Sequence, residues 1–179
     1  MKREQLEHLI RAAGAITGSR RLIVIGSQSI LGTFPFGAPE RAYLSREADL
    51  IPVDAPDKSD VISVVLGEYS PFDQSFGYFG DGVDLETARL PSNWQDRLVP
   101  IENANTNGYV GLCLEPHDLL IAKYFAGREK DHEFCAALVA ARLVDAAVLH
   151  ERLAATQLDP DDRARIAAKI DLHFQQGKA

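Results

Sequence analysis

The spacing of apolar residues predicts that the chain begins with a helix and continues into a buried strand. Apolar side chains recur at helical intervals between residues 6 and 16, and Gly18 follows as a stop signal. The next apolar run, residues 22–25, is short and unbroken, which is typical of a strand buried on both faces. It ends at Gly26, and we expect Ser27 to cap the short helix that follows.

The middle of the chain predicts further strands and another helix. Residues 32–44 contain Gly and Pro breaks and predict a loop, and residues 48–53 predict a second strand. We expect a helix from Asp57 and a hairpin over residues 76–88 that turns at residues 80–82. The inward face of that helix is predicted to carry Val61, Val64 and Val65, with Leu66 as a candidate fourth member.

After a further pair of strands at 98–101 and 109–114, the pattern becomes entirely helical. Pro116 suits a first helical turn, Asp145 can cap a later helix, and Asp159-Pro160 begins a last one. The sequence therefore predicts an α+β fold. Its first part is a mixed β-sheet flanked by helices over residues 1–115, and a C-terminal helical bundle over residues 116–179 packs on it.

Composition narrows the class of protein. The chain has 179 residues and a formal net charge of −7, which argues against a broad nucleic-acid-binding surface because phosphates would be repelled at long range. Its two cysteines, Cys113 and Cys135, lie in apolar runs without metal-ligand or redox spacing, which favours buried reduced thiols. No signal peptide or membrane-length apolar segment is present, so we expect a cytoplasmic protein without membrane contacts.

The segment Glu47-Ala48-Asp49-Leu50 carries the most informative chemistry. Alternate residues of a strand share a face, so Glu47 and Asp49 would project side by side. Adjacent carboxylates repel each other, and a divalent cation such as Mg²⁺ is the usual compensation. The competing interpretation, a solvated strand edge with two acids, stays open at this point.

A third acid is expected from the segment Val83-Asp84-Leu85-Glu86. Asp84 and Glu86 would share a face, and either one lies near Asp49 if this strand is a neighbour. Our prediction favours Asp84 over Glu86, and Asp81 is expected to be a turn residue.

These motifs together resemble a known family. A strand, Gly26-Ser27, a short helix and then an acid-x-acid strand are similar to the polymerase-β-like nucleotidyltransferase superfamily. A second match is the run of residues 115–131, which carries Pro116, Lys123 and the segment Arg128-Glu129-Lys130-Asp131. The closest resemblance is to minimal and abortive-infection-type bacterial nucleotidyltransferases.

The resemblance implies a nucleotidyltransferase-like sheet and a division of roles among the site residues. Gly26 and Ser27 would hold the triphosphate of an NTP, and Lys123 and Lys130 would add positive charge to this nucleotide site, with Asp131 orienting Lys123 or Arg128. The catalytic acids and metal ligands would be the three carboxylates Glu47, Asp49 and Asp84.

The implied activity is Mg²⁺-dependent transfer of a nucleotidyl group to an RNA, protein or small-molecule hydroxyl. A toxin–antitoxin or phage-defence setting, with an antitoxin as partner, would follow by analogy. An alternative is a catalytically inactive member that binds a nucleotide or a protein, since the family usually has Asp where this chain has Glu47.

Overall fold

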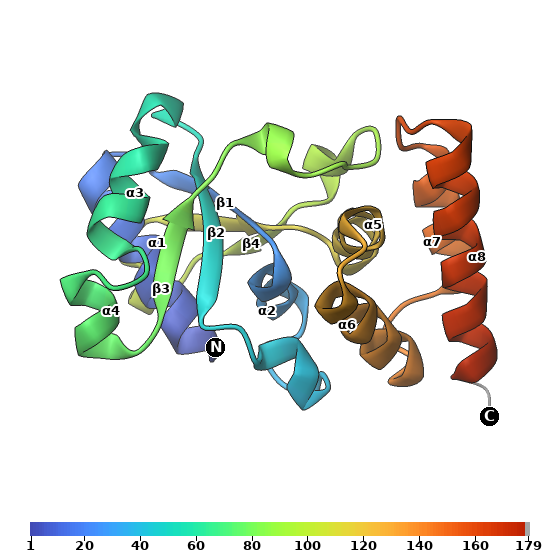
Figure 1. Cartoon of the computed structure of the whole chain (residues 1–179). Helices are drawn as coiled ribbons and strands as arrows, with labels where there is room; N and C mark the ends of the chain where they lie inside the picture. Colours follow the sequence, from blue (N-terminus) through green and yellow to red (C-terminus); the bar gives the residue numbers. More distant parts are fainter. Residues whose placement is uncertain (178–179) are drawn as a thin grey trace.

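The protein has a mixed α+β fold built on one five-stranded sheet (Figure 1). The computed structural model describes residues 1–177, apart from the side chain of Thr87. The strand order is β3-β2-β1-β5-β4, where the strands are β1 (Arg21–Ile25), β2 (Glu47–Pro52), β3 (Phe79–Gly82), β4 (Val99–Ile101) and β5 (Val110–Cys113). Strands β2 and β3 are parallel, as are β1 and β5, whereas β1/β2 and β4/β5 are antiparallel. This confirms the predicted α+β class and its mixed sheet.

Helices lie on both sides of the sheet (Figure 1). The α-helices are α1 (Arg3–Thr17), α2 (Ile30–Thr33), α3 (Ser59–Leu66), α4 (Pro71–Phe76), α5 (Pro116–Ala126), α6 (Glu129–Ala140), α7 (Ala146–Ala154) and α8 (Pro160–Gln176). Short 3₁₀ turns are η1 (Ser27–Ser29), η2 (Glu40–Tyr43), η3 (Pro56–Lys58), η4 (Leu85–Thr87), η5 (Trp94–Arg97) and η6 (Ala104–Thr106). Helices α1 and α3 contact β2 and β3, while α2 contacts β4, β5 and α5.

Several local predictions are confirmed. Helix α1 ends at Gly18, which adopts the left-handed conformation that glycine favours. Strand β1 is buried beyond its first residue. The side chains of Asp145 and Asp159 accept hydrogen bonds from the first turns of α7 and α8, as expected of N-caps. Ser27 is different: it is the first residue of η1, whose cap position is occupied by Gly26, so the predicted Ser27 cap is wrong.

The hairpin predicted over residues 76–88 is also wrong. The chain forms α4 and then the single strand β3, which runs parallel to β2 at the edge of the sheet. The edge is covered by α3 rather than by a second strand. The Ser59 hydroxyl donates to the Val83 carbonyl at 3.1 Å, and the Gly82 amide donates to the Ser63 hydroxyl at 2.9 Å.

This contact explains why the predicted inward face of α3 is wrong. Its polar serines face the edge strand because they satisfy backbone groups there. The helix therefore buries Ser59, Ile62 and Leu66, and it leaves Val64 77% exposed, with Val61 and Val65 also at the surface. Of the predicted set, only Leu66 enters the core.

The division into domains at residues 115 and 116 stays a prediction, and its last two residues, 178 and 179, lie outside the described residues. Within residues 1–177 no helix combines the length and the apolar character needed to cross a membrane.

Buried His173 and half-buried His132 connect α8 to α5 and α6. The Tyr124 hydroxyl and His173 Nδ1 are hydrogen-bonded at 3.0 Å, and the His173 ring lies 6.1 Å from that of His132. Buried Nδ1 of His132 has no hydrogen-bond partner among the described residues. Burial lowers the pKa of both histidines, and the nearby Lys169 charge lowers them further. Folding therefore favours the neutral form of both rings.

This packing predicts a loss of stability in mild acid. The unfolded histidines have pKa values of about 6.5, above those of the folded protein, so protons bind preferentially to the unfolded chain below that pH. The histidine contribution is fully present above pH ~6.5 and is lost as the pH falls toward the lowered folded pKa values. Urea unfolding at a series of pH values should show a shallower loss in His173→Gln than in the wild type. Identical pH dependence in the two proteins would contradict the assignment.

Candidate functional site

The site begins at the tight turn where β1 ends. Ile25, the last residue of β1, pairs with Asp49 across the antiparallel β1/β2 ladder, so Gly26, which follows it, passes directly beside the Asp49 carboxylate. A Cβ atom at position 26 would overlap Asp49 Oδ2, and the Gly26 φ of 70° is one that side chains rarely adopt. Glycine is therefore required for the close approach of the two strands, and Ser27 is placed at the mouth of the turn.

Three carboxylates meet on the face of the sheet opposite α1. Ala48 and Leu50 point into the core, so Glu47 and Asp49 project together on the other face, as predicted. The parallel register of β2 and β3 places Asp81 directly opposite Asp49. The Glu47 carboxyl lies close enough to Asp49 and Asp81 for both charges to act on its pKa.

The environment of these acids disfavours their charged forms. Burial raises the pKa of Glu47 to about 7, and the neighbouring Asp49 and Asp81 charges act in the same direction. Burial also raises the pKa of Asp49, while the Lys123 charge opposes that rise. Such acids carry a cost when ionised together, and a cation would remove it.

The structure corrects the turn predicted at Asp81, while the role predicted for Asp84 stays a prediction. Asp81 lies within β3 and is not a turn residue. Asp84 follows the end of that strand and is exposed, and neither Asp81 nor Asp84 is among the residues that line the cavity described below. The preference for Asp84 or Glu86 depended on the hairpin, and both residues lie outside β3. Asp81 is an acid beside Asp49 that the sequence interpretation had placed in a turn.

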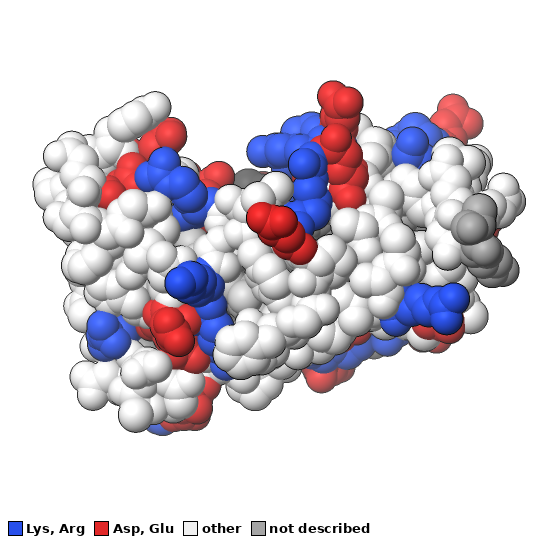
Figure 2. Space-filling view, turned by 90° about the horizontal axis from the view of Figure 1, so that it is seen from below, with Lys and Arg blue, Asp and Glu red and all other residues white. Residues whose placement is uncertain are grey.

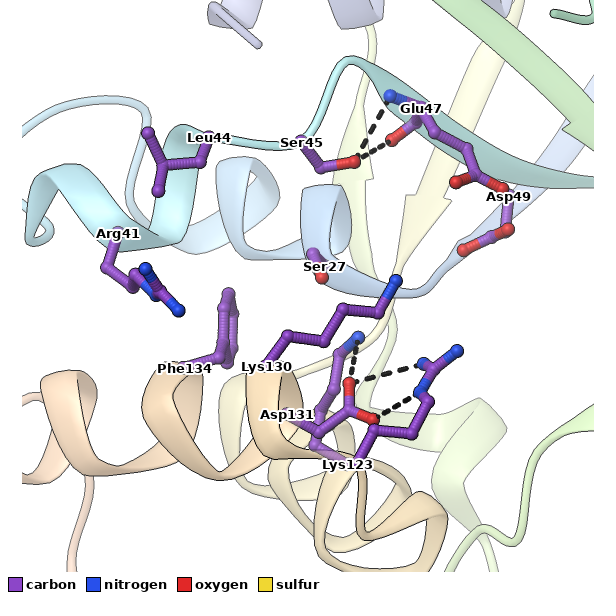
Figure 3. Close-up of a pocket in the computed structure, with 11 residues that line it drawn as sticks. Ser27, Arg41, Leu44, Ser45, Glu47, Asp49, Lys123, Lys130, Asp131 and Phe134 are labelled. Atoms are coloured by element: carbon purple, nitrogen blue, oxygen red, sulfur yellow. Dashed lines mark hydrogen bonds and ion pairs between the residues drawn. The ribbon is translucent and has the colours of Figure 1, made fainter.

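A cluster of positive charge lies across from these carboxylates (Figure 3). Buried Asp131, at the start of α6, is 1% exposed and contacts two cations. Its carboxylate accepts hydrogen bonds from Lys123 Nζ at 3.0 Å and from Arg128 Nε at 2.6 Å. Burial alone would raise the pKa of Asp131, but the bonds from Arg128 and Lys123 outweigh it and hold the pKa low. The expected orienting role of Asp131 thus has a geometric basis toward both cations.

Acids and cations face each other across one cavity of about 380 Å³. It is lined by Ser27, Arg41, Leu44, Ser45, Glu47, Asp49, Lys123, Arg128, Lys130, Asp131 and Phe134. Five of the seven predicted site residues therefore reach it, while Gly26 lies behind it and Asp84 lies outside. Lys130 extends toward the acids, and its charge acts on Glu47 (Figure 3).

Several lining residues had no recognisable signal in the sequence. Arg41, Leu44 and Ser45 belong to the segment predicted as a loop or follow it directly, and Phe134 resembled an ordinary core residue of a helix. Ser45 lies beside the first acid, where its hydroxyl accepts the Glu47 amide at 3.1 Å. Only spatial proximity identifies these residues.

The carboxylates suit a hard cation that keeps some of its coordination positions free for a substrate. Within residues 1–177, no group of three or more His, Cys, Asp and Glu side chains has the geometry of a ready-made metal site. Mg²⁺ is usually bound by one or two protein carboxylates together with water and substrate phosphates. Glu47 and Asp49 fit that pattern, since both line the cavity and both carry raised pKa values.

Comparison with known proteins agrees with this chemistry. The family model described as "Nucleotidyltransferase of unknown function (DUF6036)" matches residues 4–177. The chain belongs to this family. Membership of a nucleotidyltransferase family supports nucleotidyl transfer as the general activity. No curated protein and no solved structure matches the chain.

The buried ion pairs of this nucleotidyltransferase give a stability prediction. Asp131→Asn would leave Lys123, whose side chain is only 10% exposed, without its counter-charge. Breaking a buried pair in this way should cost about 3 kcal/mol of unfolding free energy. Urea unfolding monitored by circular dichroism measures the loss.

Asp162→Asn is the matched control, because Asp162 also pairs with an arginine three residues away but is 31% exposed. Its removal should change stability by less than about 0.5 kcal/mol. Equal effects of the two substitutions would show that Asp131 is not a buried counter-charge.

Proposed function

We propose that this protein transfers a nucleotidyl group from an NTP to an acceptor hydroxyl, with Mg²⁺ held by Glu47 and Asp49. The observation that carries the proposal is the cavity itself. On one side it presents paired carboxylates with raised pKa values, and on the other side the cations Lys123, Arg128 and Lys130. This arrangement suits a metal-bound triphosphate, which needs a cation ligand set and phosphate-binding charges within one cavity.

The residues around the cavity would have different roles in binding the nucleotide. Ser27 offers a hydroxyl at the centre of the cavity, and Lys130 lies between it and the acids (Figure 3). Lys123 and Arg128, which Asp131 holds in place, supply fixed positive charge that needs little reorganisation when the phosphates bind. Gly26 acts indirectly, since its lack of a side chain lets Asp49 reach the cavity.

The reaction forms one bond and breaks one. The acceptor oxygen bonds to the α-phosphorus, the bond from that phosphorus to the bridging oxygen breaks, and pyrophosphate leaves. The proton of the acceptor hydroxyl passes to a carboxylate of the Glu47–Asp49–Asp81 cluster. Bound Mg²⁺ would offset the charge that develops on the attacking and leaving oxygens. We assign the third acidic position to Asp81, which the β2/β3 register supports.

The acceptor and the biological setting extend the proposal by resemblance. A polymerase-β-like core over residues 1–115, followed by a helical region, would place this chain near abortive-infection-type bacterial nucleotidyltransferases. The acceptor would be an RNA, protein or small-molecule hydroxyl, and an antitoxin would be the partner in a defence setting. On the face shown in Figure 2, acidic and basic side chains form small groups of both signs around uncharged areas, which favours local recognition over a broad phosphate-binding surface.

A binding module without catalysis is the second candidate. It is favoured by the Glu at position 47 and by the absence, within the described residues, of a three-member metal cluster. Nucleotide binding that is independent of Mg²⁺, with no transfer to any acceptor, would support this candidate instead.

Transfer assays with each α-labelled NTP, Mg²⁺ and cell extract test the proposed activity. Label should appear on an acceptor, and Asp49→Asn should abolish it while the variant keeps its fold. Absence of transfer with every NTP, or transfer unchanged in Asp49→Asn, would overturn the proposal.

The same assay tests whether Asp81 or Asp84 is the third acid of the site, beside Glu47 and Asp49. Asp81→Asn should lower the transfer rate by at least about a hundredfold, because it removes charge beside Asp49 in the reacting cluster. Asp84→Asn, which changes an exposed acid beyond the strand, should stay within about threefold of the wild type. The reverse ranking would restore Asp84 to the site.

A further inference from the structure

Arg41 lies on a different structural element from the other cations of the cavity. Lys123, Arg128 and Lys130 belong to the segment from α5 to α6, whereas Arg41 lies on η2, in the stretch between the first and second strands. In Figure 3 Arg41 is at the opposite end of the cavity from Glu47 and Asp49. Ser27 and Lys130 lie between these two ends.

The backbone that carries Arg41 is held firmly. The Tyr43 hydroxyl donates to the Phe34 carbonyl and accepts the Ala38 amide, both at 3.0 Å. Ala42 is buried, and its carbonyl accepts a hydrogen bond from the buried Gln28 side chain beside Ser27. Arg41 is thus presented to the cavity from a fixed turn, so its guanidinium can select a ligand at a defined place.

The guanidinium itself remains exchangeable. Arg41 forms an ion pair with Glu133 on α6, and the two side chains are 41% and 46% exposed. Exposed pairs of this kind contribute little to stability, and a guanidinium has five N–H donors to share. A phosphate could therefore engage Arg41 at small cost. Lys123, by contrast, is only 10% exposed and is committed to buried Asp131, which Arg128 also contacts.

The proposed function fixes the order of groups along the cavity. The α-phosphate must lie at the Glu47–Asp49 end for transfer to occur, and the leaving pyrophosphate extends past Lys130 and Ser27. The last phosphate of the nucleotide then points toward the end where Arg41 lies. A planar guanidinium matches the oxygens of a terminal phosphate in a bidentate arrangement.

We propose that Arg41 binds the terminal phosphate of the nucleotide and makes the site selective for nucleoside triphosphates over diphosphates. The inference rests on the proposed function, since it takes the position of the α-phosphate from it. The segment of residues 32–44 thereby acquires a role in substrate selection, which its loop-like sequence did not indicate.

Calorimetry with nucleotide analogues that cannot be cleaved tests this role. Each protein is titrated in Mg²⁺ with an α,β-methylene NTP, the matching α,β-methylene diphosphate, and inorganic triphosphate, which has no base. Arg41→Gln should weaken the binding of both triphosphates by about ten- to a hundredfold, and the binding of the diphosphate by less than about twofold. Arg41→Lys should recover part of the loss. Arg20→Gln, which removes an exposed arginine of the exposed pair with Glu102, should change nothing.

The outcomes separate this inference from the function on which it rests. If the wild type binds none of the three ligands, the proposed function fails and the role of Arg41 fails with it. If the wild type binds them but Arg41→Gln weakens triphosphate and diphosphate alike, or changes only the preferred base, Arg41 does not read the terminal phosphate. A loss of affinity in Arg41→Gln that is confined to the two triphosphates supports the inference. In that case the Glu133→Gln variant, which frees Arg41 from its partner, should bind the triphosphates at least as tightly as the wild type.

Discussion

A buried lysine needs a counter-charge, and Asp131 provides it for Lys123 while it also pairs with the more exposed Arg128. This one carboxylate connects the end of α5 to the start of α6, and it fixes both positive charges at the wall of the cavity. Lys130, a further cation of the cavity, lies in the same first turn of α6 as Asp131. Loss of this interaction would remove the fixed orientation of the cations even if the helices stayed in place.

The opposite wall depends on strand register. The pairing of Ile25 with Asp49 and of Asp49 with Asp81 places three acids together, and Gly26 leaves the space that Asp49 needs. Burial is the main cause of the raised pKa values of Glu47 and Asp49, and the charges of the neighbouring acids act in the same direction. An acidic wall and a basic wall are therefore held apart by the fold, and a metal-bound triphosphate would complement both.

The sequence predicted the parts of this site that have a local signature. The period-2 spacing of Glu47 and Asp49 and the Gly-Ser turn are local patterns, and they were placed correctly on their strand and turn. The position of Asp81 beside Asp49 was missed because it comes from pairing with a strand distant in sequence, and Gly80-Asp81-Gly82 has the composition of a turn. Similarly, the inward face of α3 was predicted from its three valines, because the apolar pattern gives no signal for the two serines that bind the edge strand. Arg41 and Phe134 reach the cavity only through tertiary packing, which no periodicity reports.

A crystal structure of the protein with an α,β-methylene NTP and Mg²⁺ tests the central claim most directly. The account predicts a triphosphate in the cavity with its α-phosphate and the metal at Glu47 and Asp49, and with phosphate oxygens within hydrogen-bond distance of Ser27 and Lys130. A nucleotide bound elsewhere on the protein, or one whose phosphates lie away from these carboxylates, would contradict it.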